Sequence, residues 1–410
     1  MSHLAPVDLV ELRDAVGEAL SAEEPLEVIA GGSKRNLGRP LQLPHTLDLS
    51  RLSGIREYQS SELVLTAGAA TPLEEIAAAL APMQQMLAFE PPDWSALLGV
   101  PETVAKGRTL GGALACNLSG PRRIKAGAAR DHFLGFRGVS GRAEVFKSGG
   151  KVVKNVTGYD LSKLMAGSYG TLAALEELTV KVLPRPETVF TVLYFVLDPA
   201  AATVCLNRAV GSPYEVSGAA YLPPSAVAPL TSYSGTSGVA ALRLEGPTPS
   251  VLFRRERLLE EFAADGESAV LGDGDSARFW EGIGNVLPLV DLSDRIVWRI
   301  SVAPSRGVEL GEALTRRLDT RWYLDWGGGL LWAAVAGADD GGAAVIRAAI
   351  RGTDGRGTGH ATLIKGPPAL RQAVPVFEPQ PAALAALATR IKEGFDPRRI
   401  LNRGRIAEGN

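Results

Sequence analysis

The chain has 410 residues, a formal net charge of −2 and 46% hydrophobic residues. This length predicts two or three domains rather than one. The near-neutral charge argues against nucleic acid as a main partner, because binding phosphates needs a basic surface. The longest apolar runs are broken by Gly, Pro or charged residues before a membrane span is complete, so we expect no membrane span. Glu11, Arg13 and Asp14 also interrupt any signal-peptide pattern at the N-terminus.

The two cysteines, Cys116 and Cys205, are too few to hold an iron–sulfur cluster. They predict a reduced, cytoplasmic protein, with attachment to the inner membrane through partners as the alternative. Any one-electron relay would then belong to another chain.

Apolar periodicity predicts an amphipathic helix over residues 7–20 and strands over residues 26–30 and 63–67. A second helix is expected after Thr71. Thr71 would cap it, Pro72 would occupy its first position and Glu74 would complete a capping box.

Residues 144–147 and 151–154 predict a hairpin with its turn at residues 148–150. The apolar stretch 172–183 ends at Pro184 and Pro186, which predict a domain boundary there. Beyond it, residues 187–365 are typical of a separate α+β region, with strands at 189–197 and 330–335. A last helix over residues 381–393 would carry Leu384, Leu387 and Ile391 on one side and stop at Gly394 and Pro397.

The first chemical signal is a glycine-rich loop that follows the strand at 26–30. Its glycines let the backbone approach a ligand, and successive N–H groups can wrap an anion. The neighbouring polar side chains add hydrogen-bond donors, a combination that suits a pyrophosphate; an ordinary surface turn is the alternative. The loop comprises Gly31, Gly32, Ser33, Lys34, Arg35, Asn36 and Gly38.

A second small-residue segment, Thr109–Pro121, precedes Arg122, Arg123, Lys125 and Arg130. Small residues allow a bulky ligand to lie against the backbone. The alternative is a packed core turn followed by a solvated basic face. Two anion-type loops in one half of the chain favour a dinucleotide.

Residues 272–277 also fit the spacing G-x-G-x-x-A of dinucleotide-binding loops. Asp273 and Asp275 would place two negative charges against a pyrophosphate. We therefore interpret this segment as a turn followed by a helix start.

Taken together, these segments resemble the FAD-binding domain of the vanillyl-alcohol oxidase and p-cresol methylhydroxylase (PCMH) superfamily, and within it the FAD-binding subunits of bacterial glycolate oxidase. The resemblance covers nearly the whole chain, because many short stretches match the family in the same order and at the same spacing. The matching stretches are Ala30–Gly38, Phe89–Pro92, Thr109–Pro121, Arg130–Gly135, Val153–Leu161, Gly167–Leu172, Asp325–Leu330, Gly359–Leu363 and Phe395–Asn402.

The resemblance implies an α+β fold with a PCMH-type FAD-binding domain of two α/β subdomains (residues 1–186), an antiparallel-sheet cap domain (187–365) and a C-terminal segment (366–410) returning to the FAD domain. Both glycine segments would contact the FAD pyrophosphate, and the strand region after Gly170 would lie near the adenine or ribose. The implied cofactor-binding residues are the seven of the first loop with Pro91, Thr109, Gly111, Gly112, Asn117, Gly120, Arg130, Asp131, Gly170, Glu177 and Asn402.

Histidines are scarce: His3, His45, His132 and His360 are the only four. None lies in the first glycine loop, where some relatives attach FAD covalently, so we expect non-covalent FAD. Related 2-hydroxy-acid dehydrogenases use several histidines to hold a metal and a base, so we expect no metal here. His360 is a weak catalytic candidate; a structural histidine is the preferred interpretation.

The resemblance implies an FAD-carrying subunit of a glycolate or D-lactate oxidase complex, whose partners are a catalytic FAD subunit and an iron–sulfur subunit. One alternative is a stand-alone FAD oxidoreductase in which Lys365, Arg351, Tyr323 or His360 binds the carboxylate of a 2-hydroxy acid. Another is a structural partner with an idle flavin. The aromatic cluster 326–332 either frames a flavin ring or, at Trp332, packs in a core.

Overall fold

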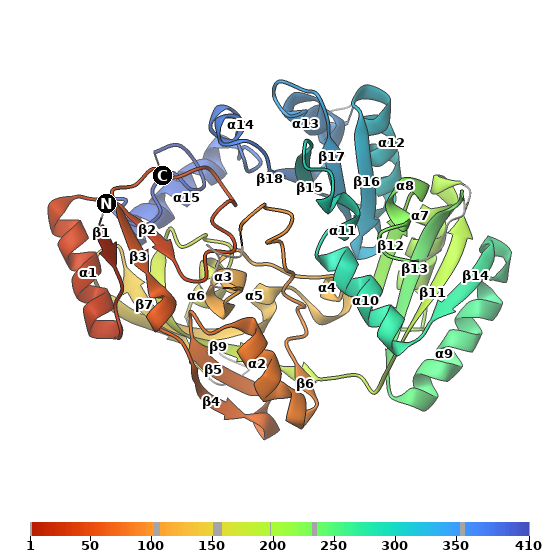
Figure 1. The fold of residues 1–410 in the computed structure, drawn as a ribbon, viewed down its shortest axis with the longest axis horizontal. Helices are drawn as coiled ribbons and strands as arrows, with labels where there is room; N and C mark the ends of the chain where they lie inside the picture. The colour runs from red at the N-terminus through yellow and green to blue at the C-terminus, as the bar shows by residue number, and fades with distance from the viewer. Residues whose placement is uncertain are drawn as a thin grey trace.

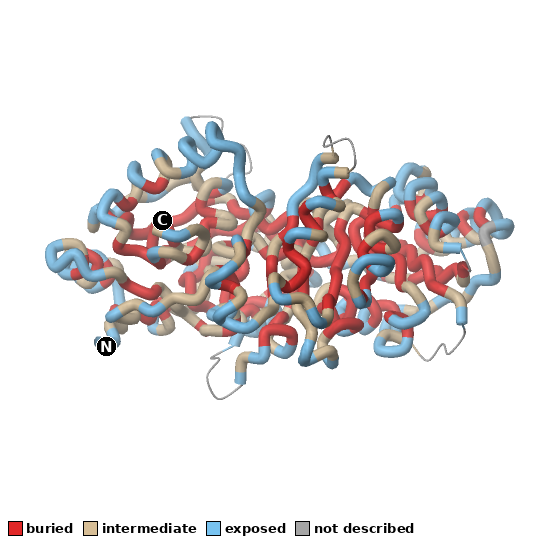
Figure 2. Tube along the Cα trace, turned by 90° about the horizontal axis from the view of Figure 1, so that it is seen from above, coloured by how far each residue is buried: buried red, intermediate tan, exposed pale blue. Residues whose placement is uncertain are grey.

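The structure, a computed structural model, describes residues 2–101, 107–150, 158–196, 198–231, 236–352 and 357–409. Figure 1 shows two regions side by side. The base region comprises residues 2–186 and 366–409, and the cap region comprises residues 187–365. Both chain ends lie in the base region, and Figure 2 shows buried backbone inside both regions with exposed segments around them.

The base region begins with a small parallel sheet of order β1-β3-β2, formed by β1 (Ser2–Leu4), β2 (Leu26–Ile29) and β3 (His45–Asp48). Helix α1 (Leu9–Ala22) buries Leu12 and Val16, and the Asp8 carboxylate accepts hydrogen bonds from its first turn. The helix expected at 7–20 and the strand expected at 26–30 are therefore confirmed, with ends shifted by one or two residues.

A five-stranded antiparallel sheet of order β4-β5-β9-β7-β8 forms the second layer of the base region. Its strands are β4 (Ile55–Gln59), β5 (Val64–Gly68), β7 (Phe133–Ser140), β8 (Val145–Gly149) and β9 (Ala173–Lys181). The predicted strand at 63–67 corresponds to β5. Shorter elements complete the region: α2 (Leu73–Leu80), β6 (Gln85–Met86), α3 (Leu110–Ala115), α4 (Arg123–Ala126), α5 (Ala129–His132), α6 (Leu161–Met165) and β10 (Leu183–Pro184).

Two local predictions in the base region were wrong. At α2, the Thr71 hydroxyl donates to the Gly68 carbonyl (2.7 Å) instead of capping the helix, and Pro72 is the N-cap residue. Glu74 pairs with Arg108 at 2.6 Å and completes no capping box. The tertiary contacts of a buried threonine override the local pattern, which sequence spacing does not show.

The hairpin turn was also misplaced. Ser148 and Gly149 belong to strand β8, where they pair with Phe136 and Gly135 of β7. The partner of β8 among the described residues is therefore the strand before it. The expected second hairpin strand at 151–154 and most of the matching stretch 153–161 lie outside the described residues.

The cap region is built on one antiparallel sheet whose strands are not in sequence order: β14-β11-β13-β12-β16-β17-β15-β18. This confirms strands at 189–196 and 330–335; residue 197 lies outside the described residues. The strands are β11 (Thr188–Val196), β12 (Gly218–Leu222), β13 (Gly238–Gly246), β14 (Glu267–Leu271), β15 (Ile296–Val302), β16 (Thr320–Asp325), β17 (Leu330–Val335) and β18 (Gly359–Lys365).

Both faces of the cap sheet are covered. On one face, a core cluster joins the sheet to α7 (Pro199–Val210), α9 (Thr248–Glu261), α12 (Gly307–Arg317) and α13 (Ala343–Arg351). On the other face, the sheet packs against α8 (Pro224–Val227), α10 (Asp273–Gly284) and α11 (Leu287–Val290), and also against Leu37, Trp94 and Leu118 of the base region. The two regions therefore share one hydrophobic core.

Residues 272–277 form the start of α10, which confirms the interpretation as a turn and a helix start. Gly272 is the N-cap residue, and the Asp273 carboxylate accepts a hydrogen bond from the backbone of Val189 (2.6 Å). Asp273 therefore ties the helix to strand β11.

The C-terminal segment returns to the base region through α14 (Pro368–Ala373) and α15 (Ala382–Phe395). Leu401 forms a parallel bridge with Leu26 of β2. Gly394 does not stop α15, because it lies inside the last turn. Leu384 and Leu387 are 52% and 43% exposed, so the apolar side of this helix is not a core face there.

Candidate functional site

A cavity of about 130 Å³, partly open to solvent, lies between the two sheets of the base region. Both glycine segments reach it, although more than 70 positions separate them in the chain. Its lining comprises Val28, Ile29, Ala30, Gly31, Gly32, Ser33, Lys34, Arg35, Leu37, Leu49, Ala69, Thr109, Gly111, Gly112, Ala115, Cys116, Tyr169, Gly170, Ala173, Leu175, Asn402 and Arg405.

The first glycine loop presents backbone donors to this pocket. Gly32 has a φ of +75°, a left-handed conformation that favours glycine. A Cβ on Gly31 would lie 2.0 Å from the carbonyl oxygen of Gly107, so no larger residue fits there. Among the described residues, the N–H groups of Gly32, Ser33 and Lys34 have no hydrogen-bond acceptor. Three successive free donors form the kind of concavity that binds an anion.

Lys34 adds a positive charge to the same loop. Its Nζ donates to the Ser33 hydroxyl at 3.1 Å, and no carboxylate of the described ranges lies within ion-pair distance. Burial lowers the pKa of Lys34 below its ordinary value. A partly buried ammonium without a counter-ion is costly, so the site is suited to an anionic ligand that supplies the missing charge.

The second glycine segment contributes close approach rather than free donors. The N–H groups of Leu110 and Gly111 already donate to Thr71 and Ala69 carbonyls, and that of Gly112 donates to Thr109 Oγ1. A Cβ on Gly111 would lie 2.7 Å from the Ala69 oxygen. The segment therefore packs tightly against β5 and leaves its other side open to the pocket.

The rest of the pocket wall is largely apolar, with Val28, Leu49 and Leu175 on it. Such a wall suits a flat ring system, whereas the loop of Lys34 suits phosphate. Cys116 also lines the pocket, and burial raises the pKa of its thiol to about 11. The thiol therefore stays protonated near neutral pH.

Three residues of the first loop have structural partners of their own. Arg35 pairs with the buried Glu27 carboxylate, which also binds Arg405 at 3.1 Å. The Asn36 amide donates to the Leu98 carbonyl. Gly38 lies against Arg405, where a Cβ would come within 2.7 Å of its side chain.

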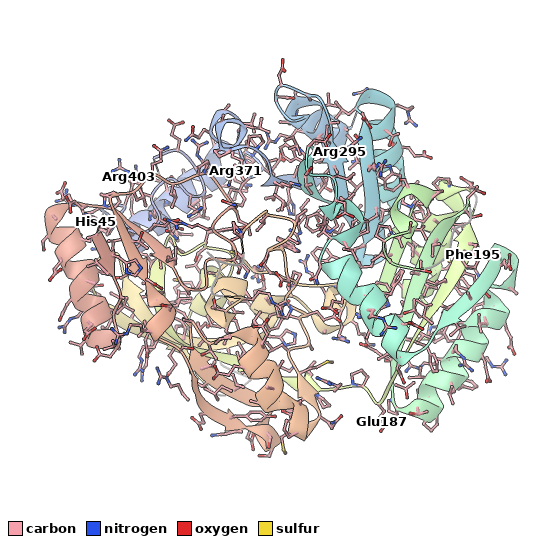
Figure 3. All side chains as sticks on the ribbon, viewed as in Figure 1. His45, Glu187, Phe195, Arg295, Arg371 and Arg403 are labelled. Atoms are coloured by element: carbon pink, nitrogen blue, oxygen red, sulfur yellow. The ribbon has the colours of Figure 1, made fainter. Side chains whose placement is uncertain are left out.

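Arg371, labelled in Figure 3, supports the same loop from α14. Its guanidinium donates to the carbonyl oxygens of Asn36 (2.6 Å) and Gly38 (3.1 Å). Asn402 accepts a hydrogen bond from Val28 N–H and donates to the Tyr169 carbonyl, each at 2.8 Å. The C-terminal segment therefore fixes the shape of the pocket.

Eight predicted residues lie outside the pocket lining: Asn36 and Gly38 of the first loop and six others. Pro91 accepts a hydrogen bond from Arg108, and Gly120 donates to the Phe89 carbonyl. Asn117 and Asp131 accept hydrogen bonds from backbone N–H groups of Arg130 and Ala128. Arg130 is exposed, and Glu177 lies 3.5 Å from Arg137. These residues support the second glycine segment and strand β9. A direct role for them in binding the cofactor stays a prediction.

The cap-side candidates are dispersed. Tyr323 is fully buried, and its hydroxyl donates to the Ile283 carbonyl. Lys365 donates to the Leu292 carbonyl, and Arg351 is exposed at the end of α13. His360 is exposed, and its pKa is lowered by partial burial and by two nearby cations, Arg299 and Arg123.

The basic stretch after the second segment is not a solvated face. Arg122 is held by Glu245 (2.8 Å) and Glu90 (3.0 Å). Arg123 lies over the ring of Trp326, 4.1 Å from its centroid. Of the four basic residues, only Lys125 and Arg130 are exposed. Burial between two regions distant in sequence decides this, and local composition does not reveal it.

Several pocket residues were missed by reasoning from sequence. Val28 and Leu49 are apolar strand-end residues without a polar signal, and Arg405 lies far from both loops in the chain. Tyr169 and Cys116 stand inside segments that matched the superfamily, and their position between glycines or small residues was the available signal. His132 is buried and its Nε2 bonds the Ala126 carbonyl, away from this lining.

Over the ranges that the structure describes, no group of three or more His, Cys, Asp or Glu residues could hold a metal ion. No helix in those ranges is long and apolar enough to span a membrane.

Residues 3–149 match the family described as FAD binding domain. The chain is 34% identical over 398 residues to the glycolate oxidase subunit GlcE of Escherichia coli (strain K12), covering 96% of each protein. It is 41% identical over 118 residues to the glycolate oxidase subunit GlcD of Bacillus subtilis (strain 168), which covers 28% of this chain and 23% of that relative.

Solved structures share the fold. A 4-ethylphenol oxidase from Gulosibacter chungangensis has a TM-score of 0.71 at 14% identity, covering 99% of this chain and 89% of that one. A p-cresol methylhydroxylase has a TM-score of 0.68 at 12% identity, covering 99% and 88%. The expected PCMH-type fold and its antiparallel-sheet cap are confirmed. By its sequence over almost its full length and by its fold, this chain belongs to the GlcE family of glycolate oxidase subunits, a family of FAD-binding oxidoreductases.

Proposed function

We propose that this chain is the FAD-carrying subunit of a complex that oxidises glycolate or a similar 2-hydroxy acid, and that it holds FAD without a covalent bond. The observation that carries the proposal is the pocket in which the free N–H groups of Gly32–Lys34 and the unpaired Lys34 ammonium converge beside an apolar wall. The two relatives named glycolate oxidase subunits support the substrate class.

In this proposal the first loop and Lys34 bind the pyrophosphate, and Gly111 and Gly112 allow its close approach. Gly170 and Asn402 shape the end of the pocket next to Tyr169. A bound flavin exchanges one or two electrons, and the protein excludes water and tunes the potential. The remaining predicted residues, such as Glu177 and Asp131, would act through the backbone that they hold.

Non-covalent binding follows from the side chains of the pocket. No histidine is among its lining residues, and Cys116 carries a thiol whose pKa of about 11 leaves little nucleophilic thiolate. Acid precipitation should therefore release the flavin into the supernatant. Flavin that stays in the protein pellet would contradict this part of the proposal.

The chain has four histidines in its whole sequence, too few for the multi-histidine metal and base site of related dehydrogenases. We therefore propose that a second, catalytic flavin subunit oxidises the 2-hydroxy acid and that an iron–sulfur subunit accepts the electrons. Co-purification of the complex, with a flavin count for each chain, tests this arrangement.

The binding test uses Lys34→Met. Loss of one charge-assisted contact to phosphate should weaken FAD binding roughly 10- to 100-fold, measured as the Kd of the flavin-free protein for FAD. The thermal stability of the flavin-free variant should not fall, because the substitution removes a partly buried, unpaired charge. Lys163→Met is the control, since Lys163 is exposed and pairs with Asp160. An unchanged Kd in Lys34→Met would overturn the site.

A stand-alone FAD oxidoreductase is the second candidate. It is favoured by Arg123 and Arg299, which lie where the cap meets the base region and have no ion-pair partner among the described residues. Purified chain, given glycolate or D-lactate with an artificial electron acceptor, separates the two. Rapid reduction of the flavin by the isolated chain would favour this candidate over the subunit role. A colourless protein that cannot be reconstituted with FAD would instead favour a structural partner.

A further inference from the structure

Two arginines from opposite regions of the molecule meet at one indole ring. Arg123 comes from α4 in the base region, and Arg299 comes from β15 in the cap sheet. Their guanidinium carbons lie 4.1 Å and 4.9 Å from the centroid of Trp326. The indole N–H of Trp326 donates to the Gly120 carbonyl at 3.1 Å, so the ring itself is fixed to the second glycine segment.

Neither guanidinium has a hydrogen-bond acceptor or an ion-pair partner among the residues that the structure describes. This is unusual here, because the neighbouring Arg122 and Arg243 are both paired with Glu90. Arg123 and Arg299 are each only partly exposed. Contact with an aromatic face offsets only part of the cost of removing two like charges from water.

The nearest acidic groups do not neutralise the pair. Asp325 is 2% exposed, and its carboxylate accepts the Trp326 N–H at 2.7 Å. Asp131, the acidic group that acts on Arg123, accepts the Ala128 N–H at 2.9 Å and forms no ion pair with Arg123. Burial and the adjacent Arg123 lower the pKa of Arg299 to about 10, which shows how poorly its charge is compensated.

The pair is also next to the pocket. Arg299 is close enough to act electrostatically on Tyr169, which lines the pocket and packs edge-on against Phe377 at 5.0 Å. Both arginines act in the same way on the exposed His360. A ligand that binds the two guanidiniums would therefore lie at the junction of the cap sheet, the second glycine segment and the pocket.

We propose that Arg123 and Arg299 form a binding site for the carboxylate of a small organic acid, completed only when the cap and the base region pack together on Trp326. A guanidinium binds a planar carboxylate through two parallel N–H···O bonds, and two unpaired guanidiniums supply more donors than one carboxylate can use. An oxygen on the adjacent carbon, as in a 2-hydroxy acid or oxalate, would accept hydrogen bonds from the remaining N–H donors. The choice of a 2-hydroxy acid as the ligand rests on the proposed function, in which the partner subunit oxidises that acid.

The test is titration calorimetry with oxalate, a stable dianion of this shape, on the flavin-loaded chain. Arg123→Gln and Arg299→Gln should each weaken oxalate binding about ten-fold or more, because a charge-assisted pair of hydrogen bonds is lost. Arg299→Lys should restore part of the affinity, since it keeps the charge but not the planar fork. Arg321→Gln is the matched control: Arg321 is exposed on β16 of the same sheet.

Acetate and inorganic phosphate are titrated in parallel. Phosphate binding as tight as oxalate would overturn the carboxylate assignment, and wild-type-like oxalate binding by both glutamine variants would overturn the site. Flavin content is measured on the same samples. If the two variants lose flavin, the arginines hold the cofactor and the proposal fails.

Failure of the proposed function gives a different result. A wild-type chain that never retains FAD but still binds oxalate through Arg123 and Arg299 would overturn the flavin role and leave this site standing. A flavin-loaded wild-type chain that does not bind oxalate would overturn only the carboxylate site. Thermal melting of each variant, compared with Arg321→Gln, shows whether a lost signal reflects unfolding.

Discussion

At the scale of single residues, charged groups between base and cap depart strongly from their behaviour in water. Asp325 is the clearest case, because burial raises the pKa of its carboxyl to about 7 although the Trp326 N–H, Arg243 and Arg299 all oppose this. The folded protein therefore binds a proton at Asp325 more tightly than the unfolded chain does. Its contribution to stability is complete at acidic pH, below the ordinary carboxyl pKa, and is lost as the pH rises through 7.

Asp325→Asn should remove this pH dependence. The amide oxygen still accepts the Trp326 N–H, but the variant has no proton to lose between about pH 4 and pH 7. The wild type should lose up to about 4 kcal/mol of unfolding free energy over the interval between the two pKa values, and the variant should be the more stable protein at pH 8. Urea unfolding across this pH range measures it, with exposed Asp339→Asn as control. Parallel curves for wild type and Asp325→Asn would refute the expectation.

At the scale of secondary-structure elements, α15 and the segment after it close the base region by means of a buried ion pair. Lys392 Nζ donates to the Asp396 carboxylate (2.6 Å), to the Thr171 carbonyl (2.6 Å) and to the Leu401 carbonyl (3.1 Å). Asp396 is 0% exposed and also accepts the N–H groups of Ile400 and Leu401. The C-terminal end of α15 therefore fixes the position of residues 400–401, which lie beside β2.

Lys392→Met should destabilise the chain by about 3–5 kcal/mol, because the substitution leaves the Asp396 charge buried and unpaired. The flavin content should fall as well, since Asn402 in the same segment holds Val28 and Tyr169 of the pocket. Urea unfolding measures the first effect and absorbance the second. Arg390→Met on the exposed face of α15 is the control and should change neither. A Lys392→Met variant as stable as this control would show that the ion pair is dispensable.

At the scale of the whole molecule, a buried ion network joins the two regions. Glu90 of the base region binds Arg243 of β13 at 2.8 Å, and Arg122 of the base region binds Glu245 of the same strand at 2.8 Å. Arg243 is 2% exposed. With the shared hydrophobic core around Trp94 and Trp332, this network should make base and cap unfold as one unit.

Glu90→Gln leaves Arg243 buried without full charge compensation and should cost about 3–5 kcal/mol at this interface. The single calorimetric transition should broaden or split as the two regions unfold separately. Glu215→Gln removes an exposed ion pair with Lys125 (3.0 Å) across the same interface and should cost about 1 kcal/mol or less. Equal melting profiles for the two variants would contradict a special role for the buried network.

The sequence by itself determined the local elements with a strong period and the two glycine loops. The helix at 9–22, strands such as 330–335 and the helix start at 273 follow from local apolar spacing and glycine or aspartate signals, so they could be predicted. Gly31 and Gly111 were recognisable because only glycine permits such close backbone approach. Most of the pocket's polar chemistry was therefore visible in the chain.

Only the tertiary structure decided which charges are paired. Arg35 and Arg122 carry the same local signal as Lys34 and Arg123, yet the first two are neutralised by Glu27 and Glu245 and the last two are not. The roles of Thr71 and Gly394 also differ from those predicted by local spacing: the Thr71 hydroxyl donates to Gly68, and α15 continues through Gly394. The physical reason is that pairing and burial depend on residues far apart in the chain, whereas periodicity and backbone conformation depend on residues close together.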